Sequence, residues 1–301
     1  MSDCVASAKA PVVGGKTLPP ELLKSLNRVT ELSSLPEITT RIVQVVEDPR
    51  STARQIHEVV QSDPALATKI LKIVNSAFYG LPSQIASLDR AIVMLGLSAV
   101  KNLALAASLS RLLKAGEVCT GFSTRDLWRH SVAVAVAAKL LARVGRYALG
   151  DEAFVAGLVH DMGLIVVQQL FTEKTRDVAE RCLATPQSYC AAEETIIGAD
   201  HQLFGAVLAT KWKFPPALRF AIGYHHEPSS LQPEFQRIAG LIYLADTLTC
   251  RGQHGYWLTG HTQDYPEWLL QLAGLTLPDI EQVGNELGAQ LVEAEQIFGS
   301  D

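Results

Sequence analysis

Apolar residues recur at helical spacing along nearly the whole chain from residue 21 onward. Pro36, for example, can open a helix whose apolar face carries Ile38 and Ile42. Strict alternation of apolar and polar residues, which is typical of a strand, never lasts for more than a few positions. The pattern therefore predicts an all-α protein in which a sheet is not expected.

Capping residues divide the first half of the chain into segments. Thr52 and Gln55 have the spacing of a capping box. Asp63 followed by Pro64 offers an N-cap and a proline at the first helical position. Two further candidate N-caps are Ser87 and Ser98. The first half is thus predicted to be a set of short helices joined by tight turns.

Longer helices are predicted in the second half, after a break at 114–123. Their expected bounds are 124–143, 151–170, 173–184, 190–198, 201–213, 215–225, 234–251 and 278–297. We therefore expect two packed helical subdomains, at 21–118 and 119–251, preceded by a flexible tail at 1–20. The remaining residues, 252–301, are expected to be a C-terminal helical extension that packs on the second subdomain.

Composition and charge limit the possible functions. The chain has 301 residues, of which 48% are hydrophobic and 19% charged, so a sizeable core can form. Its 26 Lys and Arg residues against 31 Asp and Glu residues give a net charge of −5. Two short helices at 51–62 and 64–79 superficially resemble a helix-turn-helix, but an acidic chain lacks the basic face that binds nucleic acid. Nucleic-acid binding is therefore the least favoured function.

The cysteines and the apolar stretches indicate a cytoplasmic protein. Five cysteines are scattered without a CxxC pair, a pattern typical of reduced thiols. No apolar stretch reaches about 18 uncharged residues, the length that crosses a bilayer. No basic cluster is followed by an apolar run, the pattern of a signal peptide. We therefore expect no membrane insertion.

Two predicted helical hairpins carry histidines at one end. His130 stands early in one helix and His160-Asp161 late in the next, so antiparallel packing would bring them together. His201 and His225 bracket a second hairpin, hinged at two prolines, in the same way. Both pairs are therefore expected at one end of a bundle.

Imidazole nitrogens and carboxylate oxygens that converge in this way suit Fe, Mn, Zn or Ni. His226 adjoins the second hairpin, and Asp246 lies inside an apolar helix, where a carboxylate must find a partner or stay near solvent. A single histidine in an apolar helix is more often a core or interface residue than a ligand, so both interpretations remain open. The histidines expected at the surface are His57, His254 and His261.

Several motifs, taken in order, resemble a known family. The His160-Asp161 pair, with a histidine upstream and an aspartate far downstream, resembles the HD superfamily of metal-dependent phosphohydrolases. The stretches SDPALATKILKIVNSAFYG and IASLDRAIVMLGLSAVKNLALA resemble the HDOD family, the bacterial HD-related output domain. The match continues through FVAGLVHDMG, GADHQLFGAVLATKWKFP, YHHEP and YLADTLT, and covers roughly residues 22–250. It implies that the C-terminal subdomain is HD-like.

The related HD-GYP enzymes, phosphodiesterases that cleave cyclic di-GMP, have their metal ligands in a similar order. The resemblance therefore implies one or two divalent transition metal ions, Fe, Mn, Ni or Zn. Carried over by motif, the metal ligands are His130, His160, Asp161, His201, His225, His226 and Asp246, with Asp126 as a further carboxylate.

Two departures from the HD-GYP pattern count against hydrolysis. Those enzymes have HDxGK, whose lysine helps to hold the phosphate, whereas HDMGL places Leu164 at that position here. Their HHE is followed by DGxGYP, whereas this chain continues HHEPSSLQPEF. We therefore predict a non-catalytic regulatory protein of bacterial signal transduction that acts on signalling proteins in trans. The alternative is a metal-dependent phosphohydrolase or phosphodiesterase of nucleotides, in which Lys101 or Arg129 would have to replace the lost lysine.

One element of the first half is a candidate for coupling the two subdomains. It is IVNSAFYG, with the residues Asn75, Ser76, Phe78 and Tyr79. The more conservative interpretation is helix packing, with Tyr79 as a core residue whose hydroxyl end stays polar.

Overall fold

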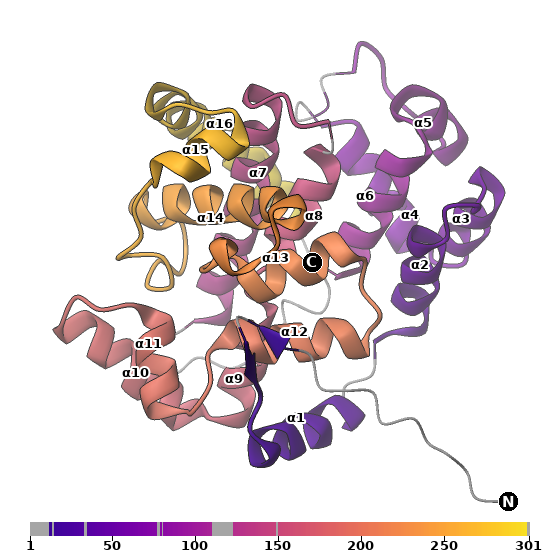
Figure 1. The fold of residues 1–301 in the computed structure, drawn as a ribbon. Coiled ribbons are helices and arrows are strands. Elements are labelled where there is room, and N and C mark those ends of the chain that lie inside the picture. Colours follow the sequence, from indigo (N-terminus) through magenta and orange to yellow (C-terminus); the bar gives the residue numbers. More distant parts are fainter. Residues whose placement is uncertain are drawn as a thin grey trace, which may run out of the picture.

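The computed structural model describes residues 12–13, 15–32, 35–76, 79, 81–109, 123–148 and 150–299. These residues form a bundle of α-helices arranged in two packed groups (Figure 1). The all-α class predicted from the apolar periodicity is confirmed. The expected break near residue 118 lies outside the described residues, as does Phe78.

The first group of helices lies at the right of Figure 1. Its members are α2 (Glu37–Glu47), α3 (Ala53–Gln61), α4 (Pro64–Val74), α5 (Leu88–Leu95) and α6 (Leu97–Leu109). The side chains of Thr52, Asp63 and Ser87 accept backbone N–H groups at the starts of α3, α4 and α5, as predicted. Ser98 is not an N-cap, because α6 follows α5 after Gly96 alone and already includes Leu97.

The second group contains the helices that carry the histidines. They are α7 (Thr124–Val144), α8 (Gly150–Val159), α9 (Met162–Leu170), α10 (Thr172–Ala184), α11 (Tyr189–Ile196), α12 (His201–Lys211), α13 (Pro216–Tyr224), α14 (Gln236–Arg251), α15 (Glu267–Ala273) and α16 (Leu277–Gly299). Two 3-10 turns, η1 (Pro228–Ser230) and η2 (Pro233–Phe235), precede α14. In the C-terminal extension, α16 packs along α7 and also contacts α4 of the first group.

The helix expected over 151–170 is broken into α8 and α9 at His160-Asp161. Asp161 has φ −94° and ψ 15°, outside the helical range, and its carbonyl oxygen accepts the N–H of Leu164 in a tight turn. The expectation of one helix was wrong because the apolar pattern runs through the break without a change of period. The turn places His160 and Asp161 at the junction of two helices.

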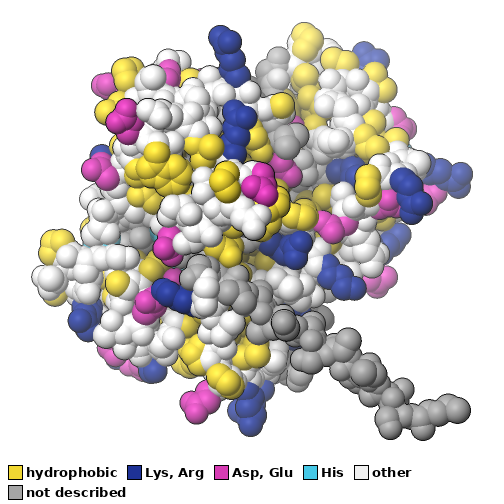
Figure 2. All heavy atoms as spheres, in the orientation of Figure 1, with side chains coloured by type: hydrophobic (Ala, Val, Ile, Leu, Met, Phe, Trp, Pro, Cys, Tyr) yellow, Lys and Arg dark blue, Asp and Glu magenta, His cyan; other side chains and the backbone are white. Residues whose placement is uncertain are grey.

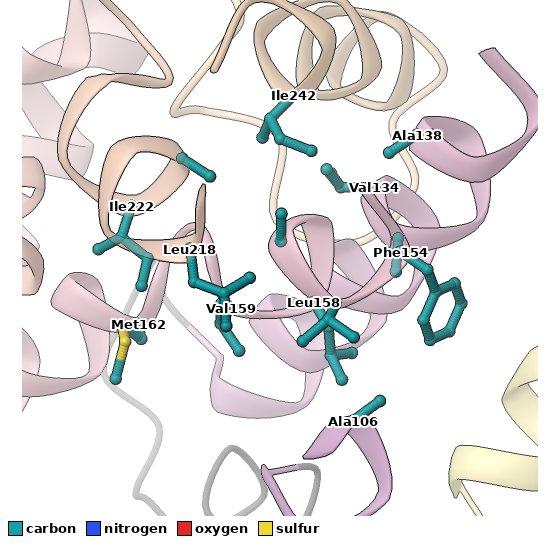
Figure 3. Close-up of a cluster of buried hydrophobic side chains, with 14 of the residues drawn as sticks. Ala106, Val134, Ala138, Phe154, Leu158, Val159, Met162, Leu218, Ile222 and Ile242 are labelled. Atoms are coloured by element: carbon teal, nitrogen blue, oxygen red, sulfur yellow. The ribbon is translucent and has the colours of Figure 1, made fainter. Parts of the chain in front are cut away.

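Helix α8 is the centre of the core. All of its residues from Ala153 to Val159 are buried, because helices α6, α7, α13 and α14 contact it on different sides. Figure 3 shows Phe154, Leu158 and Val159 of α8 among apolar side chains from these neighbours, such as Ala106 of α6. A helix that is apolar all round must be enclosed in this way.

That enclosure explains the most apolar stretch of the chain. Gly150–Leu170 is long and apolar enough to cross a membrane by length and composition, but 83% of its 18-residue window is buried inside the protein. At the surface, Figure 2 shows basic and acidic side chains interspersed over one face, with apolar side chains scattered between them and hardly any histidine.

The N-terminal segment packs on the second helical group. Strands β1 (Val12–Val13) and β2 (Lys16–Thr17) form a short antiparallel hairpin beside α12, and α1 (Pro20–Leu32) packs on α9 (Figure 1). This two-stranded sheet was not predicted, since strands of two residues are too short to show alternation. Leu18 is buried, so part of the expected tail at 1–20 contributes to the core.

A polar contact joins the first group to the α7–α8 hairpin. The hydroxyl of Tyr79 donates to Oδ1 of Asp151 at 2.7 Å, and Nζ of Lys139 donates to the same oxygen at 2.9 Å. The Lys139 ammonium also lies 3.5 Å from the centroid of the Tyr79 ring. The coupling role suggested for IVNSAFYG therefore has a physical contact at Tyr79.

The substitution Tyr79→Phe tests this contact. It removes one hydrogen bond to a partly buried carboxylate, so the free energy of unfolding should fall by about 1–2 kcal/mol. Urea denaturation measures this change. Tyr147→Phe is the matched control: among the described residues the Tyr147 ring stacks against the Arg237 guanidinium and its hydroxyl has no hydrogen-bond partner, so the change should be close to zero. Equal stability of wild type and Tyr79→Phe would show that the contact adds nothing.

Candidate metal centre

The two hairpins and α14 bring seven of the eight predicted ligands to one buried point. They are His130 at the start of α7, His160 and Asp161 between α8 and α9, His201 at the start of α12, His225 and His226 after α13, and Asp246 in α14. The ring centroids of His130 and His160 lie 5.3 Å apart, and those of His201 and His225 lie 5.4 Å apart. The antiparallel geometry predicted for both hairpins is therefore confirmed.

Asp161 lies between two groups of donor atoms. Its Oδ1 is 3.3 Å from Nε2 of His201 and 3.2 Å from Nε2 of His225. Its Oδ2 is 3.3 Å from Nε2 of His160 and 3.7 Å from Nε2 of His130. One carboxylate thus presents a different oxygen to each pair of imidazoles.

Each group has the donors of a transition-metal site. The first group is Asp161, His201, His225 and His226; the second is His130, His160 and Asp246. Within each group, one ligand atom per residue lies within 4.8 Å of all the others. In the second group, Nε2 of His130 is 3.0 Å from Oδ1 of Asp246. Nitrogen and carboxylate oxygen donors of this kind suit Fe, Mn, Ni or Zn.

Backbone carbonyl groups orient two of the imidazoles. Nδ1 of His160 lies 2.7 Å from the carbonyl oxygen of Gly157, and Nδ1 of His225 lies 3.0 Å from that of Ala221. A carbonyl oxygen only accepts, so each Nδ1 carries the proton. In the neutral ring the lone pair is therefore on Nε2, which points toward Asp161, as in metal-binding histidines.

Glu193 of α11 orients a third imidazole and was not predicted. Its Oε2 accepts from Nδ1 of His201 at 2.6 Å and from the backbone N–H of the same residue at 3.0 Å. The Glu193 side chain is buried, whereas the neighbouring Glu194 is partly exposed and pairs with Lys16. With Cys190, Glu193 and His201 also form a smaller cluster of possible ligands.

Close packing of α9 on α12 brings these residues together. A β-carbon at Gly163 would overlap the carbonyl oxygen of His201, so only glycine lets the two helices approach this closely. The glycine of the HDMG motif therefore sets the separation between Asp161 and His201.

The donor atoms are enclosed, and several of them lack a hydrogen-bond partner. The side chains of the seven residues are 0% exposed, except for that of His226 at 8%. Among the described residues, the buried atoms without a hydrogen-bond partner include both oxygens of Asp161, Oδ2 of Asp246 and Nε2 of His130 and His160. Such orphaned polar atoms are costly unless an ion satisfies them. The residues present therefore fit a metal ion.

Charge and burial set the protonation of the centre. Burial would raise the pKa of Asp161, but the charge of His160 and the other imidazoles beside the carboxylate hold it well below its ordinary value. Burial lowers the pKa of His226, and the charges of neighbouring histidines lower it further. Burial opposes protonation of His201 as well, but Glu193 and Asp161 together raise its pKa well above the ordinary value. The carboxylate is thus ionised and the His226 ring neutral, as ligands require.

The structure does not bring Asp126 into either group. It stands one turn before His130 on α7, and its backbone carbonyl oxygen accepts the N–H of Tyr256 at 2.9 Å. The three histidines expected at the surface are also outside the two groups, although each is partly buried. His57, for example, contacts Asp89 at 2.9 Å in the first helical group.

Both cations considered for phosphate binding are engaged in other contacts. Nζ of Lys101 donates to Oγ of Ser51 at 2.7 Å in the first helical group. Arg129 pairs with Glu295 of α16 at 2.9 Å. Leu164, at the position of the HD-GYP lysine, is fully buried.

A helical bundle with an adjacent His-Asp pair and converging histidines defines a protein of the HD type. The family model of the HDOD domain matches residues 32–228, which is more than half of the chain. The chain therefore belongs to the HDOD domain family, and the resemblance found in its motifs is confirmed.

Solved structures share the fold. An HDOD domain protein of unknown function from Geobacter sulfurreducens is 22% identical, with a TM-score of 0.71 over 92% of this chain and 98% of that one. A candidate signal transduction protein from Marinobacter aquaeolei VT8 is 25% identical, with a TM-score of 0.72 over 93% of this chain and 64% of that one. A candidate phosphohydrolase from Shewanella amazonensis SB2B is 24% identical, with a TM-score of 0.68 over 91% of this chain and 97% of that one.

A curated relative is also similar to this chain. It is an uncharacterized protein from Treponema pallidum (strain Nichols), 24% identical over 221 residues. The match includes 73% of this chain and 42% of the relative, so the chain spans less than half of that protein's length.

Glu193→Gln tests whether Glu193 orients the His201 imidazole for metal binding. The amide accepts a weaker hydrogen bond from Nδ1 of His201 than the carboxylate does, so affinity for the metal should fall about tenfold to a hundredfold. Competition with a coloured chelator measures the affinity. Glu194→Gln changes the adjacent exposed carboxylate and should leave the affinity for the metal as in wild type. Equal affinities of the two variants would contradict a role of Glu193 toward the metal.

Metal affinity should rise with pH. The raised pKa of His201 means that the metal-free protein keeps a proton on this imidazole at neutral pH, and the metal must displace it. Below that pKa, the affinity should therefore increase by up to about tenfold per pH unit for each proton released. Chelator competition between about pH 6 and about pH 8 measures the slope. A metal affinity that does not change with pH over this range would show that the metal does not displace a proton from His201.

Proposed function

We propose that this chain is a regulatory protein of bacterial signal transduction that holds one or two divalent transition metal ions without hydrolysing a substrate. It acts in the cytoplasm through protein partners in trans. Membership in the HDOD family and the metal-fitting donor set support this function. The ions would be held by the seven residues of the two donor groups, and Asp161 would serve both groups.

The observation that carries this proposal is the enclosure of the centre. A phosphodiester must bring its phosphorus next to a metal-activated water, but six of the seven side chains are 0% exposed and His226 is 8% exposed. A concave site that buries its substrate is the usual requirement of hydrolases. The closed centre thus favours a structural or sensory use of the metal.

The charge around the centre supports the same conclusion. Transfer of a phosphoryl group develops negative charge, which hydrolases stabilise with lysine, arginine or further metal ions. Here Leu164 stands at the lysine position, and Lys101 and Arg129 are engaged elsewhere. The net charge of −5, and the mixed charge of the face shown in Figure 2, suit protein partners better than nucleic acid.

A second candidate function is metal-dependent phosphohydrolysis. The observation in its favour is that the two oxygens of Asp161 face different donor groups, as in hydrolases that use two ions. When bound, the ions would supply Lewis acidity and an activated water. The imidazoles would hold them. Entry of a substrate would require the residues that enclose His226 to move.

The test combines metal content with turnover. Untagged protein, purified without added metal, should contain a transition metal by plasma mass spectrometry, and the His160→Ala, Asp161→Ala double variant should lose it. Protein loaded with Mn, Fe, Ni or Zn should not hydrolyse cyclic dinucleotides or a chromogenic phosphodiester. The control is His57→Ala, which lies outside the centre and should keep the metal. Turnover that disappears in the double variant would establish the second function instead.

A further inference from the structure

A segment outside the family match covers the metal centre. Residues 252–266 join α14 to α15 and lie beyond the matched residues 32–228; we call them the strap. The N–H of Tyr256 donates to the carbonyl oxygen of Asp126 at 2.9 Å, four residues before His130, and its hydroxyl donates to that of Tyr189 at 2.9 Å. The strap is thus fastened to both α7 and α11.

The strap then passes directly over Asp246. A β-carbon at Gly260 would lie 2.9 Å from Oδ2 of Asp246 and 3.0 Å from Sγ of Cys250, so only glycine permits this approach. The Arg251 guanidinium donates to the backbone carbonyl oxygen of Gln263 at 3.0 Å and to Asp264 at 2.8 Å. Both contacts hold the far end of the strap against α14.

The strap brings the Gln263 side chain to His226, the one ligand candidate with an exposed edge. The Gln263 amide contacts Nδ1 of His226, and its Oε1 lies 2.7 Å from Oγ1 of Thr247. Oγ1 of Thr247 also lies 2.8 Å from the carbonyl oxygen of Tyr243. The four residues therefore form a chain of polar contacts that ends at the imidazole.

The orientation of the Gln263 amide decides what His226 can do. If the amide N–H donates to Nδ1, the neutral ring carries its proton on Nε2 and offers no lone pair there. Half a turn of the amide exchanges its two ends without moving other atoms. The carbonyl oxygen then accepts Nδ1–H and leaves a lone pair on Nε2, which lies 3.1 Å from Nε2 of His201.

The Thr247 hydroxyl favours the second orientation. A hydroxyl has one proton, and a carbonyl oxygen such as that of Tyr243 only accepts. When Thr247 donates to Tyr243, its oxygen is left to accept an N–H of Gln263. The Gln263 carbonyl oxygen then faces His226, so the Thr247 hydroxyl, one N–H of the Gln263 amide and Nδ1–H of His226 each have an acceptor.

We propose that Gln263 is a positioning residue of the metal centre: its carbonyl oxygen accepts Nδ1–H of His226, holds Nε2 of that ring as a ligand and closes the exposed edge. This inference rests on the proposed function, because it requires a metal in the centre. It adds a residue that lies outside the HDOD match to the set that controls metal binding and release.

Two substitutions at one position test the proposal. Gln263→Leu removes the acceptor but keeps the bulk, so metal affinity should fall about tenfold or more and metal loss to excess chelator should become faster. In Gln263→Glu the carboxylate accepts the same N–H, so affinity should equal or exceed that of wild type. The Co(II)-loaded forms should differ in their visible spectra, since Gln263→Leu loses a nitrogen ligand and Gln263→Glu keeps it.

Two further variants separate positioning from packing. Gln271→Leu makes the same change on α15, where the exposed side chain donates a hydrogen bond to Glu267, and should behave as wild type. Thr247→Val removes the hydroxyl that orients the amide and should cause an intermediate fall in metal affinity. If Gln263→Leu does not fold, this variant tests the proposal in its place.

The outcomes are distinguishable. Wild-type affinity and chelation rate in Gln263→Leu would overturn the proposal, and so would equal losses in Gln263→Leu and Gln263→Glu, which indicate packing alone. A wild-type protein that binds no metal would overturn the proposed function itself. The measurement on wild-type protein shows this without any of the variants.

Discussion

Two carboxylates buried among imidazoles are the constraint on which this structure depends. Asp161 and Asp246 have no exposed side-chain surface, and most of their oxygen atoms lack hydrogen bonds. Removing such charges from water costs far more than a single hydrogen bond returns. Positive charge must therefore be supplied within the bundle, and protonated histidines or metal ions are the sources that the geometry allows.

The helical architecture follows from that requirement. The α7–α8 hairpin and the α12–α13 hairpin deliver imidazoles from opposite sides, while the turn at Asp161 interrupts a helix that is otherwise entirely apolar. Around these ligands lies a second layer that orients them: backbone carbonyl groups, the Glu193 carboxylate and the Gln263 amide. Such outer partners determine affinity nearly as much as the ligands do. The apolar core around α8, part of which Figure 3 shows, adjoins His160 at the end of that helix.

The enclosure of the donor atoms also distinguishes this centre from that of a hydrolase. In a hydrolase the ions face a cleft, whereas here the strap packs on Asp246 at Gly260 and on His226 at Gln263. This enclosure is the observation behind the proposed regulatory use of the metal. The contact between Tyr79 and Asp151 joins the first helical group to the α7–α8 hairpin.

Helical period and hairpin arithmetic were sufficient to predict the fold class and the convergence of His130 with His160. The break at Asp161 was not predictable, because the apolar pattern continues across it. Glu193 was missed since nothing in the sequence separates it from the exposed Glu194 beside it, and only tertiary packing buries one of them. Gln263 was missed because the strap has no periodicity.

Anomalous diffraction from crystals of the untagged protein, collected on both sides of a metal absorption edge, tests the central claim most directly. We expect a peak within bonding distance of Asp161, His201 and His225, with a second beside His130, His160 and Asp246 if two ions are held. A well-ordered centre without a peak, in crystals grown with Mn, Fe, Ni or Zn, would contradict it and leave these residues as a network of protonated histidines and carboxylates.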